Sequence, residues 1–176
     1  MLAYLFVLLA IAVRFLPHPF AFTPIVGALL FFGARGSRRQ MWLPLAMFFA
    51  TDIILTKFVY SYLFSWDHFV TWAWYAAILW LGMGLRNNAK PWRVIGASLA
   101  SSVSFFVLSN AAVWACWDMY PHNMGGLIMS YAAGLPFFRH ALEGDLLFTC
   151  AMFATPVLLH AAAGWVENSQ TPSAAA

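Results

Sequence analysis

The amino-acid sequence predicts an all-α polytopic membrane protein whose helices form a six-transmembrane-helix bundle. Hydrophobic residues make up 63% of the 176 residues and charged residues only 9%, whereas a soluble domain carries about 25% charged residues. The mean hydropathy is +0.76. A soluble core of this size cannot hide so much apolar surface, so the solvent must be lipid. The apolar runs are continuous, which favours helices over the alternating strands of a membrane barrel.

Six hydrophobic segments predict the spans, at residues 2–16, 20–33, 41–62, 69–85, 94–115 and 145–165. The first two are shorter than the ~20 residues that a span needs, so we expect them to be tilted, kinked or covered by neighbours. Residues 125–138 are also apolar, but glycines and Pro136 interrupt them. We interpret this stretch as a surface or re-entrant element, with a seventh span as the alternative. A long external connection then joins the fifth helix to the sixth.

Two short basic loops predict the orientation. They hold Arg35, Arg38, Arg39, Arg86, Lys90 and Arg93. Cytoplasmic loops are enriched in Lys and Arg, so both loops and both termini are placed inside (N-in/C-in). Residues 1–166 form a single transmembrane domain, and we expect the polar, small-residue tail at 167–176 to be disordered and cytoplasmic. These loops account for most of the basic charge, and the net charge of +3 does not indicate a nucleic-acid partner.

The sequence contains no motif of a known catalytic or metal site. It has no HExxH, no paired histidines on one helical turn with an acid, and no nucleophile elbow. We therefore expect no enzyme activity, no metal and no cofactor. Cys116 and Cys150 give neither a disulfide framework nor metal-ligand spacing.

The end of the first span supplies the first candidates for a substrate-binding site. Arg14 closes an apolar run, and His18 stands between Pro17 and Pro19. Proline disfavours helical geometry in the residue before it, so the helix should end there and hold His18 in a stiff external corner. Arg14 either faces a ligand or merely reaches the lipid headgroups.

Asp52 lies well inside the third segment. An ionisable group near the membrane middle is costly and is a functional candidate by default. The alternative role is structural, as a buried ion pair or as a hydrogen bond to a neighbouring helix.

Asn110, Trp114 and Asp118 recur at four-residue spacing in and after the fifth segment. This spacing places them on one helical face. A polar, aromatic and acidic stripe suits the wall of a ligand site, and it also suits an ordinary interfacial helix end.

The connection before the last span adds His122, Arg139 and Asp145 to the candidates. Glu143 and Asp145 open the predicted last helix, where the helix dipole favours acids. Asp145 facing Arg14 is a second interpretation, because the first and last spans often meet in small bundles.

Four phrases of the sequence resemble a family of bacterial six-helix membrane proteins of unknown function (DUF6580), to which a transport role is ascribed. They are "RFLPHPFAFTPIVGALLFFGA" at 14–34, "TD" at 51–52, "SNAAVW" at 109–114 and "YPHNMGGLIMSYAAGLPFFRHALEGDLLF" at 120–148. The family is distantly similar to the S-components of energy-coupling-factor vitamin transporters, small six-helix proteins that hold a vitamin near the outer face. The resemblance implies a multi-pass protein of the bacterial cytoplasmic (inner) membrane.

The same resemblance implies an energising transporter module as a partner, besides membrane lipid and a small-molecule solute. S-components often carry an Ala-x-x-x-Ala stripe on the first helix, where that module docks. Ala3, Ala10 and Ala12 do not form this stripe, a departure that puts the usual coupling in question and allows a solitary transporter.

The leading hypothesis is an S-component-like protein that binds a small, vitamin-like nutrient from the external side and transports it. Polar groups, aromatic walls and a long external cap together are typical of small-molecule sites. The alternative is a structural or assembly subunit of a larger membrane complex, in which Arg14, Asp52 and Asp145 fasten helices together. A cavity lined by Asp52 and Asn110 would favour the first hypothesis, and a packed interior the second.

Overall fold

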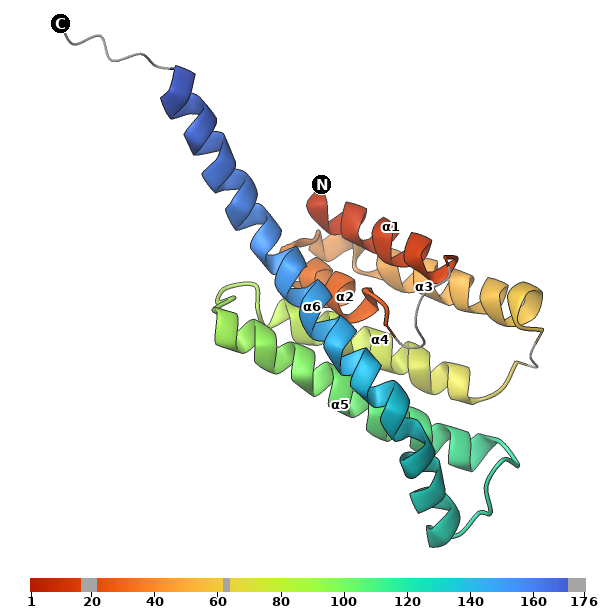
Figure 1. Cartoon of the computed structure of the whole chain (residues 1–176). Coiled ribbons are helices and arrows are strands. Elements are labelled where there is room, and N and C mark those ends of the chain that lie inside the picture. Colours follow the sequence, from red (N-terminus) through yellow and green to blue (C-terminus); the bar gives the residue numbers. More distant parts are fainter. Residues whose placement is uncertain (17–21, 62–63, 171–176) are drawn as a thin grey trace, which may run out of the picture.

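The structure is a computed structural model that describes residues 1–16, 22–61 and 64–170 (Figure 1). Within these ranges the regular structure is entirely helical, which agrees with the predicted class. Its α-helices are α1 (Leu2–Arg14), α2 (Ile25–Arg35), α3 (Trp42–Ile54), α4 (Asp67–Met83), α5 (Pro91–Cys116) and α6 (Met124–Gln170). A 3₁₀ turn, η1 (Arg38–Gln40), precedes α3, and a π-helical turn, η2 (Leu55–Val59), continues it. The candidate His18 lies outside the described residues.

Three described segments are long and apolar enough to cross a membrane, namely Arg38–Val59, Pro91–Cys116 and Met124–Val166. The helices α1 and α2 are shorter, with 13 and 11 residues, as the sequence predicted. At a rise of about 1.5 Å per residue, neither reaches across a hydrocarbon core of about 30 Å. Both must therefore rely on neighbouring helices at their ends.

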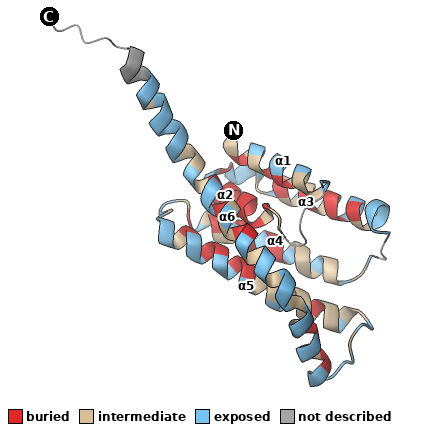
Figure 2. Ribbon diagram, in the orientation of Figure 1, coloured by how far each residue is buried: buried red, intermediate tan, exposed pale blue. Residues whose placement is uncertain are grey.

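The helix α2 is the centre of the bundle. Every residue from Val26 to Ala34 is buried (Figure 2), and α1, α4, α5 and α6 all pack against it. Edge-to-face ring contacts hold two of these neighbours: Tyr4 of α1 lies 5.1 Å from Phe32, and Phe153 of α6 lies 5.2 Å from Phe31, between ring centroids. A helix that is apolar all round needs this complete cover.

The close approach of α2 and α4 depends on two glycines that face each other. A Cβ atom on Gly33 would lie 2.8 Å from Cα of Gly82, and a Cβ atom on Gly82 would lie 2.5 Å from the carbonyl oxygen of Leu30. Small residues at a helix contact allow backbones to approach closely, as is common for helices in lipid.

The helices α5 and α6 form an antiparallel pair, and here the structure corrects the sequence prediction. The connection between them covers only residues 117–123, and residues 125–138 are part of α6. The long external connection and the separate surface or re-entrant element are therefore wrong. Neither the glycines nor Pro136 ends the helix, because its neighbour supports it: the hydroxyls of Ser130 and Tyr131 donate to carbonyl oxygens of α5 at 2.9 and 3.0 Å.

The helix α6 is longer than one span requires. Its 47 residues extend to about 70 Å at the usual helical rise, and its C-terminal part projects beyond the other helices (Figure 1). The helix continues to Gln170, into the segment that the sequence assigned to a disordered tail, and residues 171–176 lie outside the described ranges.

The two basic loops meet at one end of the bundle, which we call the basic end (residues 36–41 and 84–90). The guanidinium of Arg86 donates to the carbonyl oxygens of Gly33 and Gly36, at 2.9 and 2.7 Å. This contact ties the α4–α5 loop to the end of α2. Both loops therefore lie on the same side, as any common orientation in a membrane requires.

Candidate functional site

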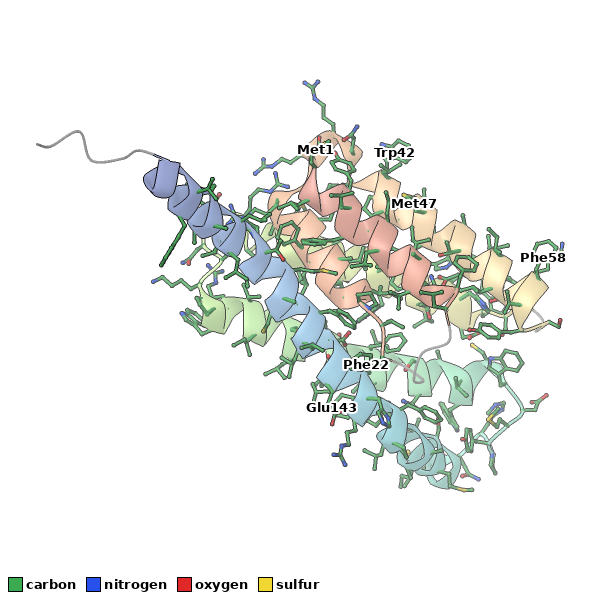
Figure 3. The ribbon with its side chains drawn as sticks, turned by 45° about the horizontal axis from the view of Figure 1, so that its top comes forward. Met1, Phe22, Trp42, Met47, Phe58 and Glu143 are labelled. Carbon is green, nitrogen blue, oxygen red and sulfur yellow. The ribbon has the colours of Figure 1, made fainter. Side chains whose placement is uncertain are left out.

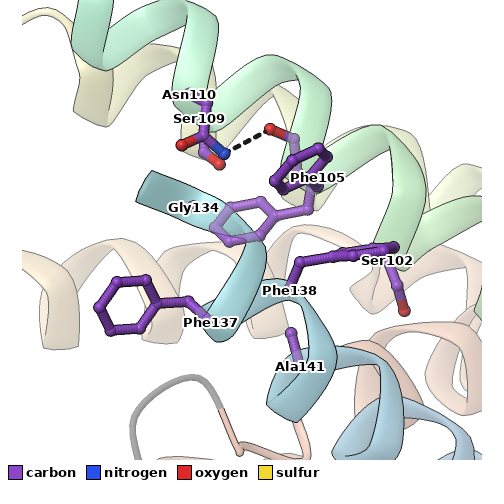
Figure 4. A pocket seen from close by; sticks show the side chains of 9 residues that line it. Ser102, Phe105, Ser109, Asn110, Gly134, Phe137, Phe138 and Ala141 are labelled. Atoms are coloured by element: carbon purple, nitrogen blue, oxygen red, sulfur yellow. Dashed lines mark hydrogen bonds between the residues drawn. The ribbon is translucent and has the colours of Figure 1, made fainter. Parts of the chain in front are cut away.

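A pocket of ≈ 190 Å³ lies between α5 and α6 (Figure 4). Its lining residues come from the parts of both helices that lie nearer the connection 117–123. Its walls combine aromatic, small and polar side chains. They are Ser102, Phe105, Phe106, Ser109, Asn110, Gly134, Phe137, Phe138 and Ala141. Four phenylalanines around a few polar groups are the composition of a small-molecule site. We call this cavity the α5–α6 pocket.

Asn110 is the predicted site residue that the structure places in this pocket. Its amide nitrogen donates to the carbonyl oxygen of Phe106 at 2.8 Å, one helical turn back. Gly134 stands opposite, and a Cβ atom there would lie 2.8 Å from Cγ of Asn110. The Asn110 amide therefore fits against α6 because Gly134 has no Cβ atom. A second hollow of ≈ 110 Å³ shares Asn110, Gly134 and Phe137 with the first.

Asp145 is buried on α6, and it does not contact Arg14. Its carboxyl Oδ2 lies 2.7 Å from the hydroxyl of Ser102, and Ser102 itself lines the α5–α6 pocket. The predicted role of Asp145 at the start of the last helix is wrong, because α6 begins at Met124. The side chain instead lies deep in the helix pair, beside the pocket wall.

Arg14 and Asp52 form an ion pair that joins α1 to α3. Thr51 accepts from the same guanidinium at 2.8 Å. Two residues of α4 complete the group: Trp72 Nε1 donates to Oδ2 of Asp52 at 2.9 Å, and the Tyr75 hydroxyl lies 3.4 Å from Oδ1. Both charges are neutralised and hydrogen-bonded inside one network of three helices. This arrangement is that of a structural fastener.

The expected stripe of Asn110, Trp114 and Asp118 is broken, because α5 ends at Cys116. Asp118 lies beyond the helix and is exposed. Trp114 instead closes the connection: its Nε1 donates to the carbonyl oxygen of Pro121 at 3.0 Å, and its ring lies edge-on to His122 at 5.9 Å. Trp114 and His122 therefore shape the turn above the pocket rather than its wall.

Arg139 points away from the pocket. It forms an exposed ion pair with Glu143 at 3.0 Å, one turn along α6. Glu143 lies on the outer face of α6 (Figure 3). The next residue, Gly144, packs against Phe22 instead: a Cβ atom at this glycine would lie 3.0 Å from a ring carbon of Phe22. An exposed pair of this kind contributes little stability, typically below about 1 kcal/mol.

Of the residues that line the α5–α6 pocket, only Asn110 was predicted from the sequence as a site residue. The partners of the two buried carboxyl groups were not predicted either; they are Trp72 and Tyr75 for Asp52 and Ser102 for Asp145. Trp72 and Tyr75 lie three residues apart on one face of α4, but nothing in their local sequence indicates a carboxylate partner. Ser102 had a detectable signal, because Ser98 and Ser102 recur at helical spacing in a row of small residues.

Among the described residues, no three His, Cys, Asp or Glu side chains gather closely enough to hold a metal ion. The donor atoms around the pocket are hydroxyls, an amide and one carboxyl group. Groups of this kind can form hydrogen bonds.

Fold and site together define a class: an apolar helical protein, with helices long enough to cross a membrane, that carries a small pocket between its last two helices. The chain belongs to the family of unknown function DUF6580, whose model matches residues 1–168. No curated protein and no solved structure shows significant similarity to it.

Proposed function

We propose that this protein binds a small solute in the α5–α6 pocket and transports it across the membrane, in the manner of an S-component. The observation that carries the proposal is the pocket itself, where Asn110 and Ser109 stand among four phenylalanine rings. Aromatic faces suit a flat ring, and the amide and the hydroxyl supply hydrogen bonds that fix its orientation. The solute class is a small polar or heteroaromatic nutrient.

The size of the pocket limits the solute. A volume of ≈ 190 Å³ is below the 300–1,000 Å³ range that is typical of sites for drug-sized ligands. A single ring system with a few polar atoms fits this space. A larger vitamin would need the adjoining hollow as well, which Asn110 and Gly134 border on their other side.

The proposed arrangement in the membrane has six spans, with both termini and the basic end inside a bacterial cytoplasmic membrane. The basic loops at one end support this orientation. The α5–α6 pocket then lies toward the external side, because the connection 117–123 is at the opposite end from the basic loops. Solute enters from outside, and an energising module or the protein alone drives its release.

The alternative function is that of a structural or assembly subunit, and one observation favours it. Arg14 and Asp52, which the sequence offered as ligand-binding residues, are paired with each other and lie outside the walls of the α5–α6 pocket. A transporter can also contain fasteners of this kind, so a test of solute binding in the α5–α6 pocket separates the two functions.

A thermal-shift screen tests the proposal. The purified protein is heated in detergent with a panel of small polar and heteroaromatic nutrients, and a bound solute should raise its melting temperature. Gly134→Ala should abolish most of that rise, because the new methyl group displaces the Asn110 amide. Gly164→Ala is the matched control on the same helix, since a Cβ atom there meets nothing within 4 Å. An undiminished rise in Gly134→Ala would argue against the pocket.

A further inference from the structure

Asp145 is a buried carboxyl group for which the described residues supply no cation. The residue is 6% exposed, near the middle of the α5–α6 contact. Arg14 does not neutralise Asp145, because its guanidinium is paired with Asp52. An isolated carboxylate inside a membrane protein is strongly disfavoured, so Asp145 requires another source of neutralisation.

The surroundings of the Ser102 hydroxyl point to a proton as that source. Its hydroxyl oxygen lies 2.7 Å from Oδ2 of Asp145 and 3.1 Å from the carbonyl oxygen of Ser98. A serine hydroxyl has one hydrogen and two acceptor lone pairs, so it cannot donate to both oxygens. A proton on Asp145 resolves the conflict, because the acid then donates to Ser102 and Ser102 donates to Ser98.

Two further hydroxyls in the same helix contact have no hydrogen-bond partner among the described residues. Ser98 Oγ and Thr149 Oγ1 are buried and unbonded, and both residues are 0% exposed. Ser98 lies four residues from Ser102 on α5, and Thr149 lies four residues from Asp145 on α6, both toward the basic end. Because the two helices are antiparallel, Ser98 and Thr149 lie at the same height along the helix pair. Unpaired buried hydroxyls are costly unless water or a proton relay uses them.

No other described titratable group faces Asp145 from the helices packed on it. On α2 the only charge is Arg35 at its far end, and on α5 the titratable groups are Arg93 in the first turn and Cys116 in the last. The segment before α2 contributes the apolar ring of Phe22, against Gly144.

On α6 itself the neighbouring titratable groups point outward. Glu143 is exposed and paired with Arg139. His140 is also exposed, and its Nδ1 lies 3.0 Å from the carbonyl oxygen of Pro136. Cys150 is exposed as well. Protonation of Asp145 is therefore governed by its own burial and by Ser102.

We propose that Asp145 is a proton-binding site inside the helix pair, linked through Ser102 to the α5–α6 pocket. Ser102 belongs both to the hydrogen bond with Asp145 and to the pocket wall. When Asp145 loses its proton, the Ser102 hydroxyl donates to the carboxylate instead of to the carbonyl oxygen of Ser98. The hydrogen bonding of the pocket wall then changes, because Ser102 is part of that wall. Coupling of this proton to solute uptake rests on the proposed function, whereas the proton site does not.

Infrared spectroscopy of the purified protein in a detergent without carbonyl groups tests the proton site without any solute. A protonated carboxylic acid has a C=O stretching band apart from the amide bands. We expect this band in the wild-type protein at neutral pH, and its loss in Asp145→Asn. Glu143→Gln, an exposed acid on the same helix, should retain the band.

A second pair of variants tests the link through Ser102. Ser102→Ala removes the hydrogen-bond partner and should shift the band, whereas Ser109→Ala, which alters the pocket wall elsewhere, should leave it in place. If Asp145→Asn does not fold, a pH titration of the wild-type protein decides, since the band must disappear as the pH rises. A wild-type spectrum without the band at neutral pH overturns the proposal. A band that appears only when choline replaces sodium also overturns it, because the site would then hold sodium.

Discussion

Arg14, the last residue of α1, is ion-paired with Asp52 of α3, and Trp72 of α4 donates to the other carboxylate oxygen. The side chains of Arg14 and Asp52 are 13% and 8% exposed. The ion pair joins α1 to α3, and the bond from Trp72 adds α4. These contacts hold the end of α1, a helix that is too short to span a membrane alone. The role of the pair follows from this position: it holds α1 and α3 against α4.

Breaking this pair should destabilise the protein strongly. Asp52→Asn leaves the Arg14 guanidinium buried without its counter-charge, and removing one partner of a buried pair costs about 3–5 kcal/mol. The midpoint of thermal unfolding in detergent should fall well below that of the wild type. Asp118→Asn, at an exposed carboxylate, is the control and should unfold as the wild type does.

The double variant Arg14→Gln/Asp52→Asn should recover part of the loss. It removes both charges, and an absent pair costs less than one unpaired buried charge. Recovery of this kind is the signature of a direct pair in a double-mutant cycle. A double variant that loses as much stability as the two single variants added together would contradict the pairing.

The glycine contact between α2 and α4 predicts a steric effect. Gly82→Ala places a methyl group 2.5 Å from the carbonyl oxygen of Leu30, and because that atom is backbone the helices must separate. Overpacking of this kind costs about 1–3 kcal/mol, measured as a lower unfolding midpoint. Gly96→Ala is the matched control on α5, where a Cβ atom meets nothing within 4 Å. It should be neutral or stabilising by up to about 1 kcal/mol.

The proposed orientation predicts which loops an impermeant thiol reagent reaches from outside. Cysteines are introduced singly at Ser37, Asn88 and Asn123 in a chain whose Cys116 and Cys150 are replaced by alanine. All three positions are exposed, so access depends on the side of the membrane alone. Asn123→Cys should react in intact cells, and the other two only after permeabilisation. Labelling of Asn88→Cys from outside would reverse the orientation.

The helical class could be predicted because hydropathy is a property of composition and needs no partner. Helix boundaries were harder to predict where local signals conflict with packing. The glycines and Pro136 within residues 125–138 are ordinary helix breakers in isolation, yet the hydroxyls of Ser130 and Tyr131 bond to α5 and keep that stretch helical. Tertiary contacts of this kind are not encoded in the local pattern.

The ionisable residues could also be found from sequence, but their partners could not. Asp52 and Asp145 are recognisable because charge inside an apolar run is rare. Which of them meets Arg14 depends on how α1, α3 and α6 are placed around α2, and no spacing rule specifies that. The resemblance to a known family offered motif positions without contacts, so the pocket between Asn110 and Gly134 emerged only from the fold.

Cysteine protection tests whether solute binds in the α5–α6 pocket. In a chain with Cys116 replaced by alanine, Ser109→Cys places a thiol in the pocket wall, while the native Cys150 lies in a separate groove beside Arg35 and serves as the internal control. The rate of alkylation of each thiol by N-ethylmaleimide is followed with and without the compound that gives the largest thermal shift. We expect the compound to slow the alkylation of Ser109→Cys and to leave the alkylation rate of Cys150 unchanged. Unchanged alkylation at Ser109→Cys, with the thermal shift intact, would place the binding site elsewhere.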